Sequence, residues 1–140
     1  MTAIVLIDTG VLVAYLKKED NFHQWAKQEL GKLQPPLLTC EAVITESCFL
    51  LRQTYQGYDK ILGLLQTGQI QLPLRLDQEF ASIRKMMNKY QSVPMSLADA
   101  CLVRMAELYE NSKILTLDSD FFIYRKSNNK IISLIIPQPC

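Results

Sequence analysis

Five short strand-like runs, separated by helical segments, constrain the fold more than any other feature of this sequence. AIVLI (3–7) and KILTLD (113–118) are typical of strands buried on both faces of a parallel sheet. The others are LLTC (37–40), KIISLII (130–136) and QIQLPL (69–74), whose Pro73 restricts it to an edge or to a strand end. Strands that alternate with helices predict an α/β fold, a three-layer α/β/α sandwich around a mostly parallel sheet of about five strands.

Helices are expected between these runs, because apolar residues recur there at helical spacing. Asp20, Asp77 and Ser96 are candidates to begin three of them. The expected helices cover 11–18, a segment from Asp20 to near Gly31, 41–55, a segment after Gly57, a segment that begins at Asp77, and 96–110. Residues 119–129, SDFFIYRKSNN, are expected to form a loop with polar ends.

Length and composition indicate an ordinary globular chain, and we expect residues 1–140 to form a single domain. The 15 basic and 14 acidic residues give a net charge of +1, so nucleic-acid binding would need a local basic patch. The four cysteines form no Cys-x-x-Cys pair and are expected to be reduced thiols rather than a zinc site. No signal peptide or membrane-spanning run is recognisable, and we expect a cytoplasmic protein.

The first run ends in Asp8-Thr9-Gly10, the triplet with which aspartic proteases present a catalytic aspartate. Such a protease carries the triplet on a loop of an all-β body and needs a second loop of the same kind. Here the triplet leads directly into a predicted helix, and helices dominate the rest of the chain. The pattern therefore favours the other interpretation, a carboxylate at the carboxyl end of the first strand of a parallel sheet.

Four acidic residues, Asp8, Glu46, Asp99 and Asp118, are candidates for a shared site. Asp8 and Asp118 close two strands, and ligands of open parallel sheets bind beyond the carboxyl ends of the strands. Glu46 and Asp99 fall on apolar helix faces that we expect to meet the core, with Ala42, Val43, Phe49 and Leu50 for the first and Leu102, Val103 and Ala106 for the second. A buried carboxylate must be paired, protonated or bound to a cation.

Each acid also has a purely structural explanation. Ser96-Leu97-Ala98-Asp99 fits a capping box, Asp8 can cap the following helix, and Asp118 can initiate a turn. Glu46 can be a partly exposed boundary residue. Glu41 is an alternative functional glutamate, although the dipole of its helix already favours an acid at that position. Together these explanations require four acids to meet at one sheet edge by accident.

A cluster of carboxylates without His or Cys ligands selects Mg²⁺ or Mn²⁺ over Zn²⁺. Such an ion removes the repulsion between like charges, which is roughly 1 to 4 kcal/mol per pair at about 4 Å. The chemistry that suits this arrangement is phosphoryl transfer, in which the ion activates water and neutralises charge at the attacked phosphorus.

Four motifs together resemble those of PIN-domain ribonucleases, of the kind found as VapC toxins in bacterial toxin–antitoxin pairs. They are IDTGVLVAYL, VITESCFLL, SLADACLVRMA and LTLDSDFF, and the resemblance covers essentially the whole chain. The resemblance implies Mg²⁺- or Mn²⁺-dependent endonucleolytic cleavage of RNA, a homodimer and a small antitoxin protein that blocks the site. Its implied catalytic and metal-binding residues are Asp8, Glu46, Asp99 and Asp118, with Asp120, Thr9 and Thr116 as auxiliary residues.

Arg125, Lys126 and Lys130 are the best candidates for contacts with RNA phosphates, because they follow the last acids in the chain. Two other functions remain open. One is a PIN-like module that binds RNA or a partner protein without cutting. The other is a phosphatase or receiver-like domain in which Asp8 accepts a phosphoryl group, although the second aspartate that such phosphatases carry two residues further on is absent.

Overall fold

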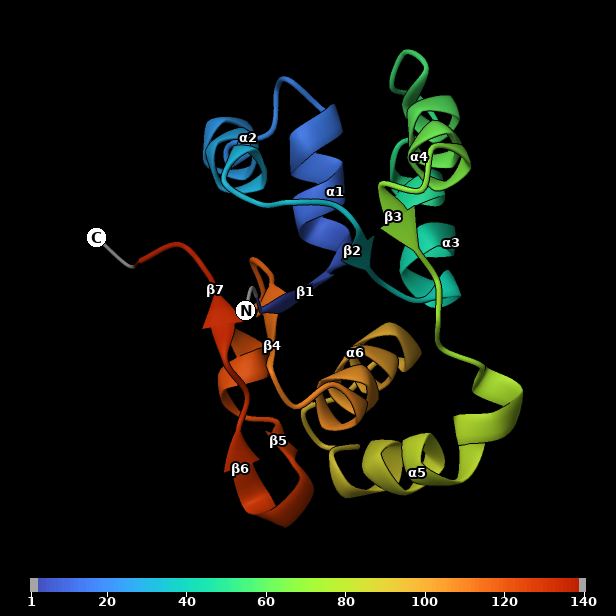
Figure 1. Cartoon of the computed structure of the whole chain (residues 1–140), viewed down its shortest axis with the longest axis vertical. Coiled ribbons are helices and arrows are strands. Elements are labelled where there is room, and N and C mark those ends of the chain that lie inside the picture. The colour runs from blue at the N-terminus through green and yellow to red at the C-terminus, as the bar shows by residue number, and fades with distance from the viewer. Residues whose placement is uncertain (1–2, 139–140) are drawn as a thin grey trace.

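A five-stranded parallel sheet runs through the centre of the molecule in the computed structural model, which describes residues 3–138 (Figure 1). The strand order is β3-β2-β1-β4-β7, and every neighbouring pair is parallel. The bounds are β1 Ile4–Ile7, β2 Leu37–Leu38, β3 Ile70–Gln71, β4 Ser112–Leu115 and β7 Leu134–Ile135. A separate antiparallel hairpin consists of β5 (Arg125–Lys126) and β6 (Lys130–Ile131).

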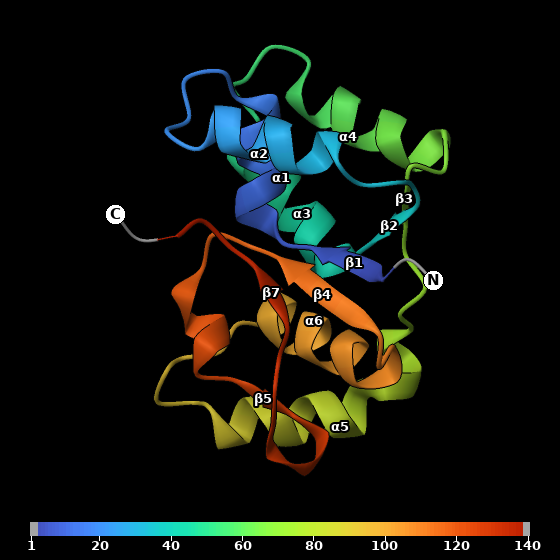
Figure 2. The same ribbon diagram turned by 60° about the vertical axis from the view of Figure 1, so that its left-hand side comes forward.

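Helices cover both faces of this sheet. Figure 2 shows α1, α2 and α4 above the sheet and α5 and α6 below it, while α3 packs against α1, α4 and α6. The bounds are α1 Thr9–Leu16, α2 His23–Gly31, α3 Glu41–Leu50, α4 Gly57–Gln66, α5 Leu76–Lys89 and α6 Leu97–Leu108. Two short 3₁₀ segments, η1 (Ser119–Phe122) and η2 (Ser127–Asn129), lie between β4 and β6. The predicted three-layer α/β/α fold is confirmed.

The two central strands form the middle of the core, because helices cover them from both sides. Leu6 and Ile7 of β1 and Ile114 and Leu115 of β4 are fully buried. Each such side chain contributes about 1.5 to 3 kcal/mol of hydrophobic stabilisation. The predicted apolar stripe of α6 (Leu102, Val103 and Ala106) is also buried, and α6 packs on β1 and β4. No helix within residues 3–138 combines the length and the apolar character needed to cross a membrane.

The prediction for the C-terminal part of the chain was wrong in two places. The run 130–136 is not one strand, because residues 130–131 pair with β5 as β6 and residues 134–135 join the main sheet as β7. The expected loop 119–129 contains η1, β5 and η2. Asn128 and Asn129 at its end have positive φ angles of 61° and 58°, which asparagine tolerates better than most residues, and this allows the tight reversal between β5 and β6.

Several helix boundaries also differ from the prediction, and α1, expected over 11–18, spans Thr9–Leu16. Asp20 is not the N-cap of α2. Its carboxylate accepts a hydrogen bond from the Phe22 amide at 2.9 Å, Phe22 is the N-cap, and the helix begins at His23. α3 ends at Leu50 instead of residue 55, and α5 begins at Leu76, so that Asp77 lies in its first turn. Pro73 was predicted to restrict its strand to an edge or to a strand end, and this is confirmed: β3 is an outer strand of the sheet and ends before Pro73.

The described cysteines are free thiols, as predicted. Cys40 and Cys101 are buried, and Cys48 is half-buried. Burial raises the pKa of the Cys48 thiol. Cys140 lies outside the described residues. These three side chains therefore act as small apolar groups of the packing.

Candidate active site

The acidic residues lie where the connections of the sheet change direction. From β1 the chain builds β2 and β3 on one side and then crosses to β4 on the other side of β1. Ile7 is opposite Leu115 in the parallel pair, and the Asp8 amide extends this ladder by donating to the Leu115 carbonyl oxygen at 3.0 Å. Asp8 and Thr116 are therefore neighbours at the carboxyl edge of the sheet, in the crevice where ligands of parallel sheets bind.

Asp8 is buried, with 7% of its surface exposed, and two hydrogen bonds hold its carboxylate. Oδ1 accepts from the Thr9 amide at 2.8 Å, so that Asp8 caps α1, and Oδ2 accepts from the Thr116 hydroxyl at 2.7 Å. Burial raises the pKa of Asp8 to about 6; the two hydrogen bonds oppose the rise, and the charges of Asp99 and Asp118 add to it. The surroundings of this carboxylate are short of positive charge.

Asp99 is half-buried in the first turn of α6 and belongs to the predicted capping box. The Ser96 hydroxyl accepts from the Asp99 amide at 3.0 Å, and Asp99 Oδ2 accepts from the Ser96 amide at 3.3 Å. The same Oδ2 accepts from the Tyr124 hydroxyl at 3.1 Å. Burial raises the pKa of Asp99, against the effect of these hydrogen bonds, and the Asp118 charge adds to the rise. The capping explanation is correct but incomplete, since a cap requires neither Tyr124 nor an acidic neighbour.

A chain of hydrogen bonds joins Asp118 to Asp8 through Thr116. The fully buried Thr116 hydroxyl donates to Asp8 and accepts from the Asp118 amide at 3.0 Å. Asp118 Oδ1 accepts from the Asp120 amide at 2.9 Å and so caps η1, in which Asp120 is half-buried. Thr116 thereby fixes the first acid relative to the last one.

Asp8, Asp99 and Asp118 form one electrostatic cluster, because the charges of Asp99 and Asp118 both raise the pKa of Asp8. The ion pairs within residues 3–138 involve none of these three acids. The cluster is open, however: in the same part of the chain no three Asp, Glu, His or Cys side chains lie close enough together to hold one metal ion directly. The acids are near enough to repel one another but do not form a closed ligand cage.

Glu46, the fourth predicted acid, lies on α3 and is exposed. The prediction that its helix face packs on the core was wrong, because Glu46, Phe49 and Leu50 are all exposed. The buried stripe of α3 consists of Val43, Ile44 and Ser47 and continues to Leu51. α3 carries apolar residues on both sides, so periodicity could not identify the side that meets the core. Among the described residues, no hydrogen bond or ion pair connects Glu46 to the three aspartates.

The predicted basic residues lie on the hairpin. Lys126 and Lys130 are directly opposite each other in the β5–β6 pair. Nη1 of Arg125 donates to the carbonyl oxygens of residues 122–124 at 2.6 to 3.2 Å, and the Arg125 amide donates to the Tyr90 hydroxyl at 3.0 Å. The Arg125 guanidinium is therefore largely engaged in holding its own loop, which leaves the two lysines as the freer charges of this group.

Tyr124 is the site residue that the sequence analysis missed. It is fully buried, and its ring packs edge-on against Tyr90 and Phe121, with centroid distances of 5.2 and 5.3 Å. This packing fixes the hydroxyl against Asp99, and burial followed by the charge of Asp99 raises the pKa of Tyr124, so that it remains a donor. The contact joins residues 25 positions apart, and no local pattern in the expected loop pointed to it.

Tyr124→Phe is expected to destabilise the metal-free protein by about 1 kcal/mol at neutral pH, because Asp99 loses a buried donor. Thermal unfolding should show a fall in Tm of roughly 3 to 6 °C. Tyr55→Phe is the matched control, since Tyr55 is 82% exposed, and it should leave the Tm unchanged. Equal melting of the Tyr124→Phe variant and the wild type would mean that this hydrogen bond does not hold Asp99.

Two comparisons with known proteins bear on this site. A family model described as "PIN domain" matches residues 5–126. The chain is also 28% identical, over 121 residues, to "Ribonuclease VapC26" of Mycobacterium tuberculosis (strain ATCC 25618 / H37Rv). That match covers 84% of this chain and 89% of the relative. The residues that the family model matches include Asp8, Asp99 and Asp118.

Proposed function

We propose that this chain, which belongs to the PIN-domain family, is a Mg²⁺- or Mn²⁺-dependent endoribonuclease that cleaves single-stranded or structured RNA. The observation that carries the proposal is the cluster of Asp8, Asp99 and Asp118 at the sheet edge, which no basic side chain of the described residues neutralises. Repulsion between neighbouring carboxylates destabilises the folded protein when no cation is bound. The same carboxylates provide the oxygen ligands that a divalent cation prefers. The similarity to a ribonuclease supports the choice of RNA as the substrate.

The donor set suits a hydrated ion better than a tightly caged one. Mg²⁺ is commonly held by one or two carboxylates and keeps several of its waters, so the open spacing of the cluster is compatible with it. Within residues 3–138, Asp99 Oδ1 and Asp118 Oδ2 accept no hydrogen bond, and the buried Thr9 hydroxyl has no partner. Asp8, Asp99 and Asp118 would hold the ion, partly through its water ligands, with Thr9 and Asp120 as auxiliary polar groups.

When bound, the ion would act as a Lewis acid and would activate a water for attack on a phosphodiester. The residues of the chain supply the geometry: Thr116 sets Asp8 relative to Asp118, while Ser96 and Tyr124 orient Asp99. The burial of Asp8 keeps bulk water from one side of the site, where electrostatic interactions are then stronger. Preorganised charge of this kind is the main contribution that a protein makes to phosphoryl transfer.

Cleavage of a labelled single-stranded RNA by the purified protein tests this function. We expect cleavage with Mg²⁺ or Mn²⁺ and none after chelation, because no basic side chain within residues 3–138 forms an ion pair with the cluster. Asp8→Asn, purified in the same way, controls for contaminating nucleases. Cleavage that continues with excess chelator, or equal cleavage by both preparations, would rule the proposal out.

Glu46 is proposed as a fourth acid of the site, on the basis of the VITESCFLL motif. Because its side chain is exposed, solvent screens its charge, and we expect Glu46→Gln to lower kcat only about tenfold, equivalent to about 1.4 kcal/mol. Glu41→Gln is the matched control, because Glu41 projects about 140° away around α3 and should leave kcat within a few-fold of wild type. A larger effect at Glu41 than at Glu46 would identify Glu41 as the functional glutamate.

We propose further that the chain is the toxin of a toxin–antitoxin pair, acts in the cytoplasm as a homodimer, and is blocked by a small antitoxin protein. Exposed large apolar side chains support protein contacts: Phe49 and Tyr55 are 61% and 82% exposed at α3 and the loop after it, and Phe80 of α5 is 60% exposed. Light scattering tests the dimer. Loss of RNA cleavage on addition of the protein encoded by a neighbouring small reading frame tests the antitoxin.

A PIN-like module that binds RNA or protein without cutting is the second candidate. The open spacing of the three aspartates and the exposure of Glu46 favour it. Widely spaced carboxylates can bind a cation that also contacts an RNA phosphate, without activating a water for cleavage. Metal-dependent RNA binding without turnover would distinguish this module from the nuclease.

A further inference from the structure

A groove of about 310 Å³ lies between α5 and the β5–β6 hairpin, and none of the three clustered aspartates lines it. One wall carries Lys85 and Lys89 of α5, and the other carries Arg125 and Lys126 of β5. Figure 2 shows the hairpin lying alongside α5 on the lower side of the sheet. The end of the hairpin adds amide side chains, Asn128 and Asn129, to the lining.

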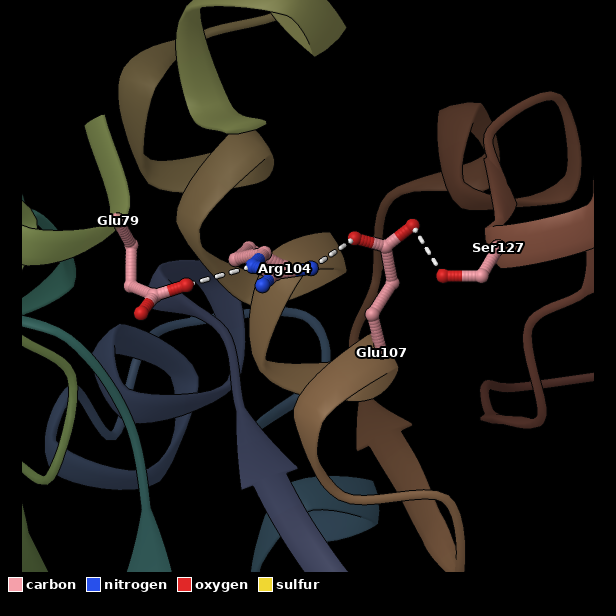
Figure 3. Close-up of polar contacts among 4 residues, drawn as sticks. All are labelled: Glu79, Arg104, Glu107 and Ser127. Carbon is pink, nitrogen blue, oxygen red and sulfur yellow. Dashed lines mark hydrogen bonds and ion pairs between the residues drawn. The ribbon is translucent and has the colours of Figure 1, made fainter. Parts of the chain in front are cut away.

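The charges of this groove are almost all positive. Five of the 15 basic residues of the chain line it, but only one of its 14 acids, Glu107. Figure 3 shows that this acid is already engaged: Arg104 donates to Glu79 at 2.8 Å and to Glu107 at 3.0 Å, and Glu107 also accepts from the Ser127 hydroxyl at 3.1 Å. The network ties α5, α6 and the hairpin together, and among residues 3–138 no ion pair compensates the groove lysines.

Two pairs of like charges occur around the groove. Lys85 and Lys89 are separated by one helical turn, and Lys126 and Lys130 are directly opposite each other across the hairpin. Like charges in either arrangement repel and destabilise the element that carries them. The helix dipole accounts for Lys89 in the last turn of α5, but it accounts for neither Lys85 nor the hairpin pair. An anionic ligand would relieve both repulsions.

The groove is connected to the acidic cluster by packed side chains. Tyr90, at the end of α5, lines the groove and packs edge-on against Tyr124 at a centroid distance of 5.2 Å. The Tyr124 hydroxyl donates to Asp99 at 3.1 Å. Two side chains, Tyr90 and Tyr124, therefore connect this positively charged groove to Asp99, in a protein whose net charge is only +1.

We propose that this groove binds the phosphodiester backbone of RNA next to the cleavage site, with Lys85, Lys89 and Lys126 as the main phosphate contacts. The proposal rests on the proposed ribonuclease function for the identity of the polyanion. It assigns a binding role to α5, which lies outside the acidic site. Phosphate contacts of this kind provide affinity and position but little sequence preference.

The test measures binding of a single-stranded RNA oligonucleotide to the Asp8→Asn protein by fluorescence anisotropy at several salt concentrations. Lys85→Gln combined with Lys89→Gln should reduce the slope of log K against log salt by about 1.4, because each lost phosphate contact removes about 0.7. Relative to 1 M salt, this corresponds to a loss of roughly 25-fold in affinity at 0.1 M. Lys18→Gln combined with Lys27→Gln, on exposed positions before and within α2, changes the net charge equally and should leave the slope unchanged.

An unchanged slope in the groove variant, or an equal change in the control variant, would overturn the proposal. So would a polyglutamate peptide that competes as well as an RNA of equal charge, because the groove would then be a site for an acidic protein. With Asp8 intact, the groove variant should raise KM and preserve kcat. Failure of the wild type to cleave RNA, combined with the expected binding result, would refute the nuclease and leave the groove standing. Cleavage of RNA by the wild type, together with unaltered RNA binding by the groove variant, would support the nuclease and refute the groove.

Discussion

Asp8→Asn is expected to lower kcat for RNA cleavage by at least about 100-fold, and Asp99→Asn by a similar factor. Removal of one electrostatic catalytic group from a preorganised site costs roughly 2.7 to 4 kcal/mol of transition-state stabilisation. Both carboxylates are held by hydrogen bonds, and Asp8 is buried, so water cannot replace either of them without loss. The measurement is the initial rate of cleavage at saturating RNA, with Mn²⁺ and with Mg²⁺.

Asp59→Asn is the matched control for this experiment, because Asp59 is an exposed acid in the first turn of α4 and should leave kcat unaffected. The variants should also be compared at several metal concentrations, since a lost ligand raises the concentration needed for half-maximal activity. Full activity of Asp8→Asn would remove this residue from the site and, with it, the argument for the cluster.

The second large effect concerns stability. Burial raises the pKa of Asp8 from an ordinary value of 3.8 to about 6, so the folded protein binds this proton more tightly than the unfolded chain does. Below the pKa of the unfolded chain, Asp8 is protonated in both states and does not change the free energy of unfolding. As the pH rises through about 6, the folded state must ionise a buried group, and stability falls by up to about 3 kcal/mol.

Asp8→Asn should therefore make the metal-free protein more stable at pH 7 to 8, by about 1 to 3 kcal/mol, because an amide carries no charge and loses only part of the bonding to Thr116. In thermal melts with chelator this corresponds to a rise in Tm of roughly 3 to 12 °C. The difference should disappear near pH 3 and below, under the unfolded value of 3.8, where wild-type Asp8 is protonated in both states.

Mn²⁺ supplies the second half of this stability test. An ion that binds only the folded protein stabilises it by about 1.4 kcal/mol at roughly ten times its Kd, and this gain should be much smaller in Asp8→Asn. A variant that is less stable than the wild type at pH 7, together with a wild type indifferent to Mn²⁺, would return Asp8 to the role of a simple helix cap.

Much of the site could be predicted from local patterns. Asp8 and Asp118 each follow an apolar strand-like run, and parallel strands bring their carboxyl ends to one edge, so the sequence was sufficient to place both acids there. The capping box of Ser96 and Asp99 was equally visible, because its residues lie within one helical turn. These features depend on short-range geometry that is the same in every protein.

Glu46 shows where local patterns failed. α3 carries apolar residues on both sides, and only the packing of α1, α4 and α6 against it decides which side is buried. Local patterns also failed for the run 130–136, whose two ends join different sheets. Residues 130–131 pair with β5 in the local hairpin, while residues 134–135 pair with β4 at the edge of the main sheet.

The sequence by itself determined the class of fold, the end-of-strand acids and the caps, since each follows from periodicity over a few residues. Only the tertiary structure decided that Thr116 donates to Asp8 across 108 positions, that Tyr124 donates to Asp99 across 25, and that the hairpin meets α5 to form a basic groove. Contacts between distant segments depend on how the whole core packs. That packing is a property of all the side chains together and leaves no signature in any one segment.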